Sequence, residues 1–377
     1  MARGLLHYAD RLRRARLYHS GSGDIDHEHH LQAAADWLKR AQDAGSDRGV
    51  SYGVDFGGTW KDSYPETTGY IIPTFLKLAD YYHDPSFFTR AVEMGQWESA
   101  VQMECGAVMG GRLTSAPSPA VFNTGMVMLG WSALYERTAD PTFLTSLRRA
   151  SDWLLGLQDR DGTWRQGNSQ FANPNSTVYN VKAAWGLCEA GRVAGIPAAV
   201  GGAVRNAEFC LTRQLPNGWF RDCCLLDASQ PLLHTTAYAM QGLIGNGVSA
   251  KRDDFVHAAR RTADSLMSLM DADGFIPGCI GPDFKGTVRW SCLTGTAQTA
   301  IVWGRLFQLT GDSRYREAMH RATGYLIRRH DVDNADPRLR GGVPGSWPVW
   351  GSYGRLQILN WATDFLVEAL MLQRSIG

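Results

Sequence analysis

A repeat of about 56 residues runs through the sequence and constrains its fold more than any other feature. Pro85, Pro141 and Pro197 are 56 residues apart, and Trp97 and Trp153 keep the same step. An aspartate precedes the first two of these prolines, and Asp-Pro is typical of a helix start because aspartate caps the helix and proline needs no backbone N–H there. A regular period of this length indicates one large domain built from similar helical units, covering residues 1–377.

Each repeat contains two helices of different character. One has apolar residues at helical spacing with charges between them, as expected of a half-exposed helix, and the other is apolar on nearly every side, as expected of a buried helix. The half-exposed helices are predicted near 31–44, 86–103, 142–158, 198–214, 254–270 and 313–329. Six exposed and six buried helices in alternation predict an all-α fold, the (α/α)6 toroid. An open solenoid would need polar end caps, and the last helix of this chain is apolar.

The buried helices share a polar and aromatic start. The segment from Ser63 to Leu76, SYPETTGYIIPTFL, places Glu66 in the first turn and apolar residues after it. The other five starts are predicted at Phe122, Ser176, His234, Trp290 and Ser352. In a closed ring these starts, and the loops that lead into them, would meet at one mouth.

Net charge and the distribution of apolar residues indicate which classes of binding partner to expect. The 377 residues carry a formal net charge of +1, which gives no electrostatic reason to expect nucleic acid or an anionic membrane surface as a partner. The longest uncharged run, Leu113 to Tyr135, matches the repeat, so it is interpreted as a buried helix and no membrane span is expected.

The N-terminal segment and the cysteines predict a cytoplasmic protein. Residues 1–20 lack the apolar segment of a signal peptide, and their leucines and arginines predict an amphipathic segment packed on the toroid. Seven cysteines form no CxxC pair and are odd in number, which favours free thiols in a reducing compartment.

The predicted mouth gathers carboxylates, a histidine, amides and aromatic rings, a set suited to binding a glycan. The candidate catalytic residues are Glu66, His234, Tyr64, Asp55 and Tyr238. The candidate substrate-binding residues, including a rim of tryptophans, are Trp60, Asn123, Tyr179, Asn180, Asp222, Trp290, Trp347, Trp350 and Tyr353.

Two chemistries fit this set. In a glycoside hydrolase, Glu66 would pair with a second carboxylate, from Asp55, Asp222 or Asp283, on either side of the glycosidic bond. In a lyase or C5-epimerase, His234 or a tyrosine such as Tyr64, Tyr238 or Tyr353 would remove the C5 proton of a uronic acid, while an asparagine or arginine neutralises its carboxylate.

No metal or cofactor is expected. His27, His29 and His30 form a cluster with ligand-like residues, but they directly precede or begin a half-exposed helix, where acidic and polar groups cap the start. Glycine-rich nucleotide-binding loops and the GxSxG motif are absent from the sequence.

Several segments resemble known families. SYPETTGYIIPTFL, preceded by GVSYGVDFGGTWKD, resembles a VpsJ-like bacterial toroid family found with exopolysaccharide biosynthesis genes, which implies a polysaccharide substrate and association with polysaccharide synthesis machinery. Tyr64 to Thr68 is similar to a Tyr-Pro-Thr-Thr element of the C-terminal helical domain of glucuronyl C5-epimerases, with Glu66 inserted. The loops DRDGTW after Gln158 and LPNGWF after Gln214 resemble the QW-type loops of squalene-cyclase and prenyltransferase toroids, for which a structural role in tight turns is expected.

These resemblances leave three classes of function. The first is a carbohydrate-active enzyme that processes a bacterial surface polysaccharide or its precursor. The second is a terpenoid cyclase or prenyltransferase, but the nearest matches to its acidic motifs, Asp331 to Asn334 and Asp253-Asp254, fall outside the predicted mouth. The third is a non-catalytic glycan-binding subunit.

Overall fold

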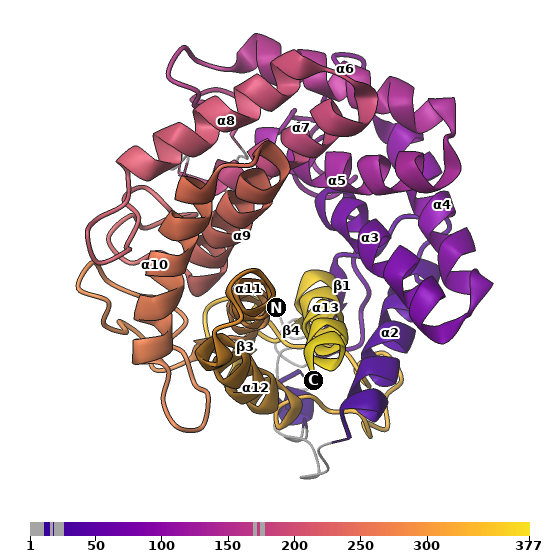
Figure 1. Ribbon diagram of the computed structural model, residues 1–377. Coiled ribbons are helices and arrows are strands. Elements are labelled where there is room, and N and C mark those ends of the chain that lie inside the picture. The colour runs from indigo at the N-terminus through magenta and orange to yellow at the C-terminus, as the bar shows by residue number, and fades with distance from the viewer. Residues whose placement is uncertain (1–10, 16–17, 19–25, 169–171, 174–177) are drawn as a thin grey trace.

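Helices arranged as two concentric rings make up the computed structural model (Figure 1). It describes residues 11–15, 18, 26–168, 172–173 and 178–377. In this part of the chain the outer helices are α2 (His27–Asp43), α4 (Pro85–Val101), α6 (Pro141–Leu157), α8 (Pro197–Thr212), α10 (Asp253–Leu269) and α12 (Ser313–Ile327). The inner helices are α3 (Pro65–Tyr82), α5 (Val121–Thr138), α7 (Val181–Ala194), α9 (Leu233–Ala250), α11 (Leu293–Thr310) and α13 (Asn360–Ile376).

The inner ring is closed. Each inner helix contacts the next along the chain, and α13 returns to pack against both α3 and α2. Figure 1 shows the yellow α13 beside the indigo and violet helices of the first repeat. The predicted (α/α)6 toroid is therefore confirmed.

Burial separates the two rings. In the outer helix α6 the buried positions Phe143, Leu147 and Leu154 follow helical spacing, so one face meets the inner ring and the other meets water. In the inner helix α9 every residue from Leu233 to Gly247 is buried. A helix apolar all round is stable only where neighbours cover it on every side, which the double ring provides.

Glycines let the inner helices approach closely. A Cβ added to Gly186 of α7 would lie 1.9 Å from the carbonyl oxygen of Gly125 in α5. A Cβ added to Gly125 would lie 2.4 Å from the Cα of Ala183. Any larger side chain here would push α5 and α7 apart, because both obstacles are backbone atoms.

The two ends of the ring differ in their connections. Short turns lead from each inner helix to the next outer helix, whereas long loops lead from each outer helix to the next inner helix. The long loops are tied together by short antiparallel strands: β1 (Gly53–Asp55) pairs with β4 (Gln357–Leu359), and β2 (Ser291–Cys292) pairs with β3 (Ser346–Trp347). We call these the loop end and the turn end of the ring.

The repeated glutamines hold the outer ring together. The side-chain amide of Gln158 donates to the carbonyls of Gly162, in its own loop, and Gly202, in α8, at 3.0 and 2.8 Å. The side chains of Gln102 and Gln214 make the equivalent pairs of bonds. Gly162 and Gly218 in these loops have the left-handed backbone of tight turns, with φ of 86° and 91°, which confirms the structural role predicted for the QW-like loops.

Two inner helices begin five or more residues later than predicted. α13 begins at Asn360 instead of Ser352, because residues 352–356 form a turn with left-handed backbone at Gly354 and Leu356, and β4 follows this turn. α7 begins at Val181 after the short 3-10 helix η1 (Val178–Asn180), and the predicted start at Ser176 lies outside the described residues.

Part of the N-terminal segment is described. Residues 11–15 are helical, and Arg14 forms an ion pair with Asp336 at 2.9 Å. The hydroxyl of Tyr18 donates to the carbonyl of Gly342. Most of the predicted amphipathic segment, residues 1–10, 16–17 and 19–20, lies outside the described residues. Among the described helices, none has both the length and the apolar character that a bilayer span requires.

Candidate active site

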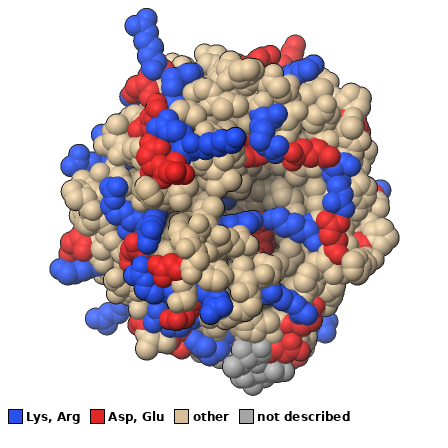
Figure 2. Space-filling model, viewed as in Figure 1, with Lys and Arg blue, Asp and Glu red and all other residues tan. Residues whose placement is uncertain are grey.

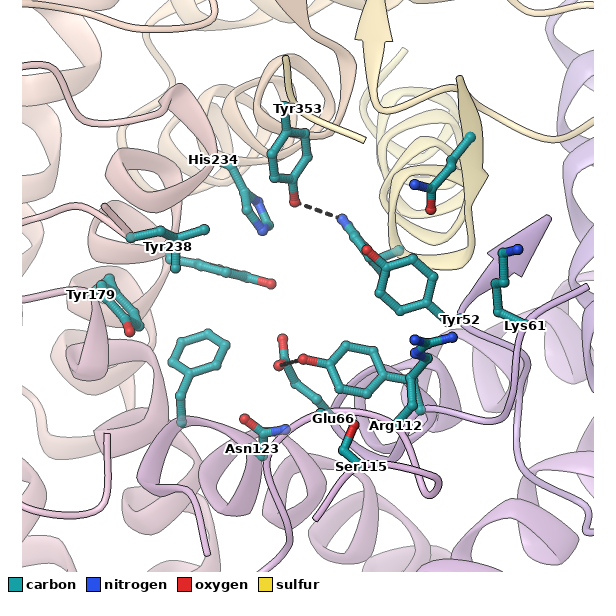
Figure 3. A pocket seen from close by; sticks show the side chains of 16 residues that line it. Tyr52, Lys61, Glu66, Arg112, Ser115, Asn123, Tyr179, His234, Tyr238 and Tyr353 are labelled. Atoms are coloured by element: carbon teal, nitrogen blue, oxygen red, sulfur yellow. Dashed lines mark hydrogen bonds between the residues drawn. The ribbon is translucent and has the colours of Figure 1, made fainter. Parts of the chain in front are cut away.

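A cavity of about 420 Å³ opens at the loop end of the ring. It is bounded by the first turns of α3, α5 and α9, the segments that lead into them, and the segment around β4. Figure 3 shows its side chains converging on one open space. The described residues that line it are Tyr52, Lys61, Tyr64, Glu66, Gly111, Arg112, Ser115, Phe122, Asn123, Tyr179, Leu225, His234, Tyr238, Tyr353, Gln357 and Trp361.

Glu66 lies in the first turn of α3, directly after the proline that begins the helix. Its Oε2 accepts a hydrogen bond of 2.5 Å from the hydroxyl of Tyr64. Burial raises the pKa of Glu66 to about 7, although the Tyr64 bond and the charge of Lys182 act in the opposite direction. A carboxyl group that titrates near neutral pH is suited to general acid–base catalysis.

His234 lies on the other side of the cavity, in the first turn of α9. Its Nδ1 is 2.7 Å from Oε1 of Gln298, and its ring centroid is 4.2 Å from that of Tyr238. Burial lowers the pKa of His234 to about 3, so the imidazole is neutral in the free protein.

Tyrosine hydroxyls form much of the polar wall. Burial raises the pKa of Tyr64, Tyr238 and Tyr353 well above 10. These groups therefore stay protonated at neutral pH, and each hydroxyl keeps a proton that it can donate to a ligand. The hydroxyl of Tyr353 also accepts a bond of 2.9 Å from the indole N–H of Trp361.

Two cations at the rim were not singled out by the sequence. Lys61 is paired with Asp55 at 3.0 Å. Arg112 lies 3.9 Å from Asp62, and this long contact is its only ion pair among the described residues. Both lie in the long loops that precede inner helices, and that position is the sequence signal that could have identified them. Tyr52, Ser115, Gln357 and Trp361 also line the cavity and were not predicted.

The structure brings half of the predicted site residues to this cavity. They are Glu66, His234, Tyr64, Tyr238, Asn123, Tyr179 and Tyr353. The remaining predictions, Asp55, Trp60, Asn180, Asp222, Trp290, Trp347 and Trp350, are not among its described lining residues.

The displaced polar residues have local partners. Oδ1 of Asp55 accepts the backbone N–H groups of Gly57 and Thr59 at 2.9 and 3.1 Å, so this carboxylate shapes its own turn. Asp222 is paired with Arg213. The amide nitrogen of Asn180 donates to the side chain of Asn168.

The predicted tryptophan rim lies elsewhere. Trp60 packs on Trp37 with 5.3 Å between ring centroids, and Trp290 covers Gly278. Trp347 lies near Tyr18, and Trp350 is 55% exposed. The cavity instead takes its aromatic surface from Phe122, Trp361 and five tyrosines.

The arrangement bears on both candidate chemistries. Glu66 is the only carboxylate among the described lining residues, and Asp283, another proposed second carboxylate, pairs with Lys285. A two-carboxylate hydrolase requires both groups across one glycosidic bond. The described cavity instead has one carboxyl group, Glu66, and one imidazole, His234, which can each exchange a proton with a bound substrate.

The histidine cluster near residue 27 is engaged in local contacts. Asp26 caps α2 by accepting the N–H groups of Glu28 and His29. Nδ1 of His30 lies 3.0 Å from Nδ1 of His330. Within the described ranges, no group of three or more histidine, cysteine or acidic side chains could hold a metal ion.

A second cavity, of about 400 Å³, lies at the turn end, on the opposite side of the ring. Figure 2 shows this face hollowed near its centre. Its charged residues include Lys77, paired with Glu368 at 2.9 Å, and the buried Lys182. Burial lowers the pKa of Lys182 to about 7, against the charges of Glu368, Asp364 and Glu66.

Comparison with known proteins identifies fold relatives. No family model matches the chain, and no curated protein sequence matches it. It is similar to an unsaturated glucuronyl hydrolase specific for heparin, with a TM-score of 0.74, 15% identity, and coverage of 92% of this chain and 96% of the other. It is also similar to the glycosaminoglycan-degrading unsaturated glucuronyl hydrolase of Bacillus sp. GL1, with a TM-score of 0.72, 15% identity, and 92% and 96% coverage. A third relative is the cellobiose 2-epimerase of Bacillus thermoamylovorans B4167, with a TM-score of 0.72, 10% identity, and 92% and 98% coverage. At these identities the chain shares the toroid fold of these enzymes.

Proposed function

We propose that this protein transfers a proton at C5 of a uronate residue in a glycan, and that it acts as a C5-epimerase. The observation that carries the proposal is the placement of Glu66 and His234 on opposite sides of one cavity. Inverting a stereocentre requires a proton to leave one face of the carbon and another to arrive on the opposite face. Two acid–base groups across a cavity supply both roles.

The substrate carboxylate must be neutralised for C5 to lose a proton. Removing that proton places negative charge on the carboxylate oxygens, and a positioned cation stabilises this charge. Arg112 is the candidate, because it lines the cavity and its nearest carboxylate, 3.9 Å away, leaves its guanidinium available for a bidentate contact.

The reaction balances without a further reactant. His234 takes the C5 proton, and the C–H electron pair moves into the carboxylate as an enediolate. Protonated Glu66 then gives a proton to C5 from the opposite face, and exchange with water restores both groups. A bound carboxylate near His234 favours its charged form and raises its low pKa, which makes it a stronger base in the complex.

The fold relatives support a sugar substrate. Their names describe glucuronyl hydrolases and a cellobiose epimerase, so the toroid serves both hydrolysis and epimerisation of sugars. A lyase would share the first step with an epimerase but expel the O4 substituent. A cyclase or prenyltransferase is less favoured, since Asp253, Asp254, Asp331 and Asp333 do not line the described cavity. A binding subunit would need no acid–base pair.

We also propose that the substrate belongs to a cytoplasmic exopolysaccharide synthesis system, with which the protein associates. The resemblance of the Ser63 to Leu76 segment supports the synthesis system. The cysteines support the compartment, since all seven are free thiols.

The test is incubation of the purified protein with polymannuronate, polygalacturonate, heparosan and a neutral glucan in deuterated water. Proton NMR should show loss of the C5 proton signal and appearance of the inverted uronate, with no change in the neutral glucan. Absorbance near 235 nm would identify an unsaturated lyase product, and new reducing ends alone would identify a hydrolase. Either result, or no change in any uronate, would contradict the epimerase proposal.

A further inference from the structure

A chain of buried hydrogen bonds links the cavity at the loop end to the cavity at the turn end. It begins at Lys182 in α7, whose Nζ donates to Oε1 of Gln241 in α9 at 2.8 Å. The side-chain amide of Gln298 in α11 donates to the same oxygen at 3.2 Å. Oε1 of Gln298 then faces Nδ1 of His234 at 2.7 Å. All four side chains are at least nine-tenths buried.

The chemistry of these side chains determines which atom donates and which accepts at each hydrogen bond of the series. In its ammonium form, which prevails below its pKa of about 7, Lys182 has N–H donors and no acceptor, so the atom of Gln241 that faces it must be the carbonyl oxygen. That oxygen also faces Gln298, which must therefore present its NH₂ group to Gln241. Gln298 then has only its carbonyl oxygen left for the histidine. A carbonyl oxygen can only accept, so Nδ1 of His234 must carry the proton.

Contacts with two aromatic rings fix the position of Lys182 at the start of this hydrogen-bond series. Its Nζ lies 4.5 Å from the ring centroid of Tyr238 and 4.7 Å from that of Phe365. Cations are attracted to aromatic faces at such distances. The ammonium is thus confined between two rings and the oxygen of Gln241, directly beneath the aromatic wall of the site.

We propose that Gln298, oriented by Gln241 and Lys182, is a positioning residue that holds the proton of His234 on Nδ1 and leaves Nε2 as the proton acceptor for the substrate. The neutral imidazole has one donor and one acceptor nitrogen, and only the acceptor can take a proton from carbon. Figure 3 shows this imidazole reaching into the cavity. The opposite tautomer would present a donor there and could not begin the reaction.

The tautomer can be read without any substrate. Nitrogen NMR of the full chain labelled with ¹⁵N-histidine separates protonated from bare ring nitrogens, and a His234→Gln sample identifies the His234 signals among those of the ten histidines. Below the pKa of Lys182, about 7, and above that of His234, about 3, we expect a protonated Nδ1 and a bare Nε2. A proton on Nε2, or an even mixture of the two tautomers, would overturn the proposal.

Variants of Gln298 test the cause. Gln298→Glu offers only acceptor oxygens, so the tautomer should be kept and the pKa of the imidazolium should rise. Gln298→Leu removes the acceptor, so the proton should redistribute toward Nε2 and kcat should fall about 100-fold with little change in KM. The matched control is Gln308→Leu, because Gln308 is an exposed glutamine on the same helix. This variant should keep both the tautomer of His234 and kcat unchanged. An unchanged tautomer in Gln298→Leu would refute the role of Gln298.

The kinetic part of this inference rests on the proposed function, whereas the NMR part does not. A protein with the expected tautomer that exchanges no C5 proton would refute the epimerase and leave the positioning role intact. An active epimerase whose His234 carries its proton on Nε2 would refute the positioning role and leave the proposed function intact. If Gln298→Leu fails to fold, the wild-type and Gln298→Glu spectra still decide the tautomer.

Discussion

The cavities at the two ends of the ring have nearly the same volume, about 420 and about 400 Å³, but their polar groups are used differently. At the turn end the charged lining residues bind one another or nearby side chains: Lys77 with Glu368, Lys182 with Gln241, Glu189 with Arg192, and Arg305 with Gln308. At the loop end the only ion pair of Arg112 within the described part of the chain is its 3.9 Å contact with Asp62. Oδ1 of Asn123 there has no hydrogen-bond partner among the described residues.

This difference supports the proposal that the substrate binds at the loop end. A buried polar atom without a partner costs free energy unless a ligand or water completes it. The loop end carries such an atom, Oδ1 of Asn123, together with the proposed acid–base pair, whereas the charges at the turn end stabilise one another. Volume alone would not have distinguished the two cavities.

The largest expected effect is loss of activity on changing the acid–base pair at the loop end. Glu66→Gln removes the proton donor without changing its shape, and His234→Gln removes the acceptor. Each should lower kcat by about 100- to 10,000-fold, because a positioned acid or base contributes that much. Steady-state epimerisation rates measure the effect.

The matched control lies at the turn end. Glu189→Gln alters a carboxylate of the second cavity and should leave kcat within about threefold of the wild type, since it is not part of the proposed machinery. Equal losses in Glu66→Gln and Glu189→Gln would show that the two ends cannot be separated in this way.

A smaller effect is expected at the cation of the rim. Arg112→Gln should raise KM for a uronate oligosaccharide by about 10- to 100-fold, because a hydrogen bond to a charged group contributes about 1.5–3 kcal/mol. Arg112→Lys should restore part of the affinity but not the bidentate contact. Arg305→Gln at the turn end is the control. An unchanged KM in Arg112→Gln would remove Arg112 from the carboxylate site.

The smallest effects concern the free energy of unfolding. Replacing one glutamate by glutamine should raise it at the loop end and lower it at the turn end. The pKa of Glu66 is raised from 4.5 to about 7, so between these values the folded protein holds a proton that the unfolded chain has lost. Stability contributed by this group is present below pH 4.5 and is lost as pH rises through about 7. Glu66→Gln should therefore gain about 1 to 3 kcal/mol relative to the wild type over this range, measured by urea unfolding.

Glu368 at the turn end should behave in the opposite way. Burial acts to raise its pKa, but the charge and hydrogen bond of Lys77 bring it below the usual value. Its contribution is present above the unfolded pKa and is lost as pH falls through the folded pKa, so Glu368→Gln should be destabilised at neutral pH. A gain in stability for Glu368→Gln at pH 7 would contradict this assignment.

The sequence predicted the fold because its signals are local and repeated. Proline steps, apolar helix faces and turn glutamines recur at a fixed period, and each reports a nearby structure. The same reasoning located Glu66 and His234, because the first turns of inner helices must meet at one end of a closed ring.

The loop residues could not be placed in this way. Whether Trp60 or Arg112 faces the cavity depends on how long loops pack on one another, and the pairing of β1 with β4 joins segments about 300 residues apart. The hydrogen bonds that join Lys182, Gln241 and Gln298 could not be predicted from the sequence either. These residues lie inside apolar helices and meet only when three inner helices pack together.

The most direct test of the central claim, that the proton leaves C5 on one side of the cavity and returns from the other, is isotope distribution in the first turnover. A uronate oligosaccharide is mixed with excess protein in deuterated water and quenched early. We predict deuterium at C5 of the inverted product and none in the recovered starting isomer, because the group that removes the proton is not the group that delivers one. Deuterium appearing equally early in the starting isomer would show that a single group does both, and would contradict the account.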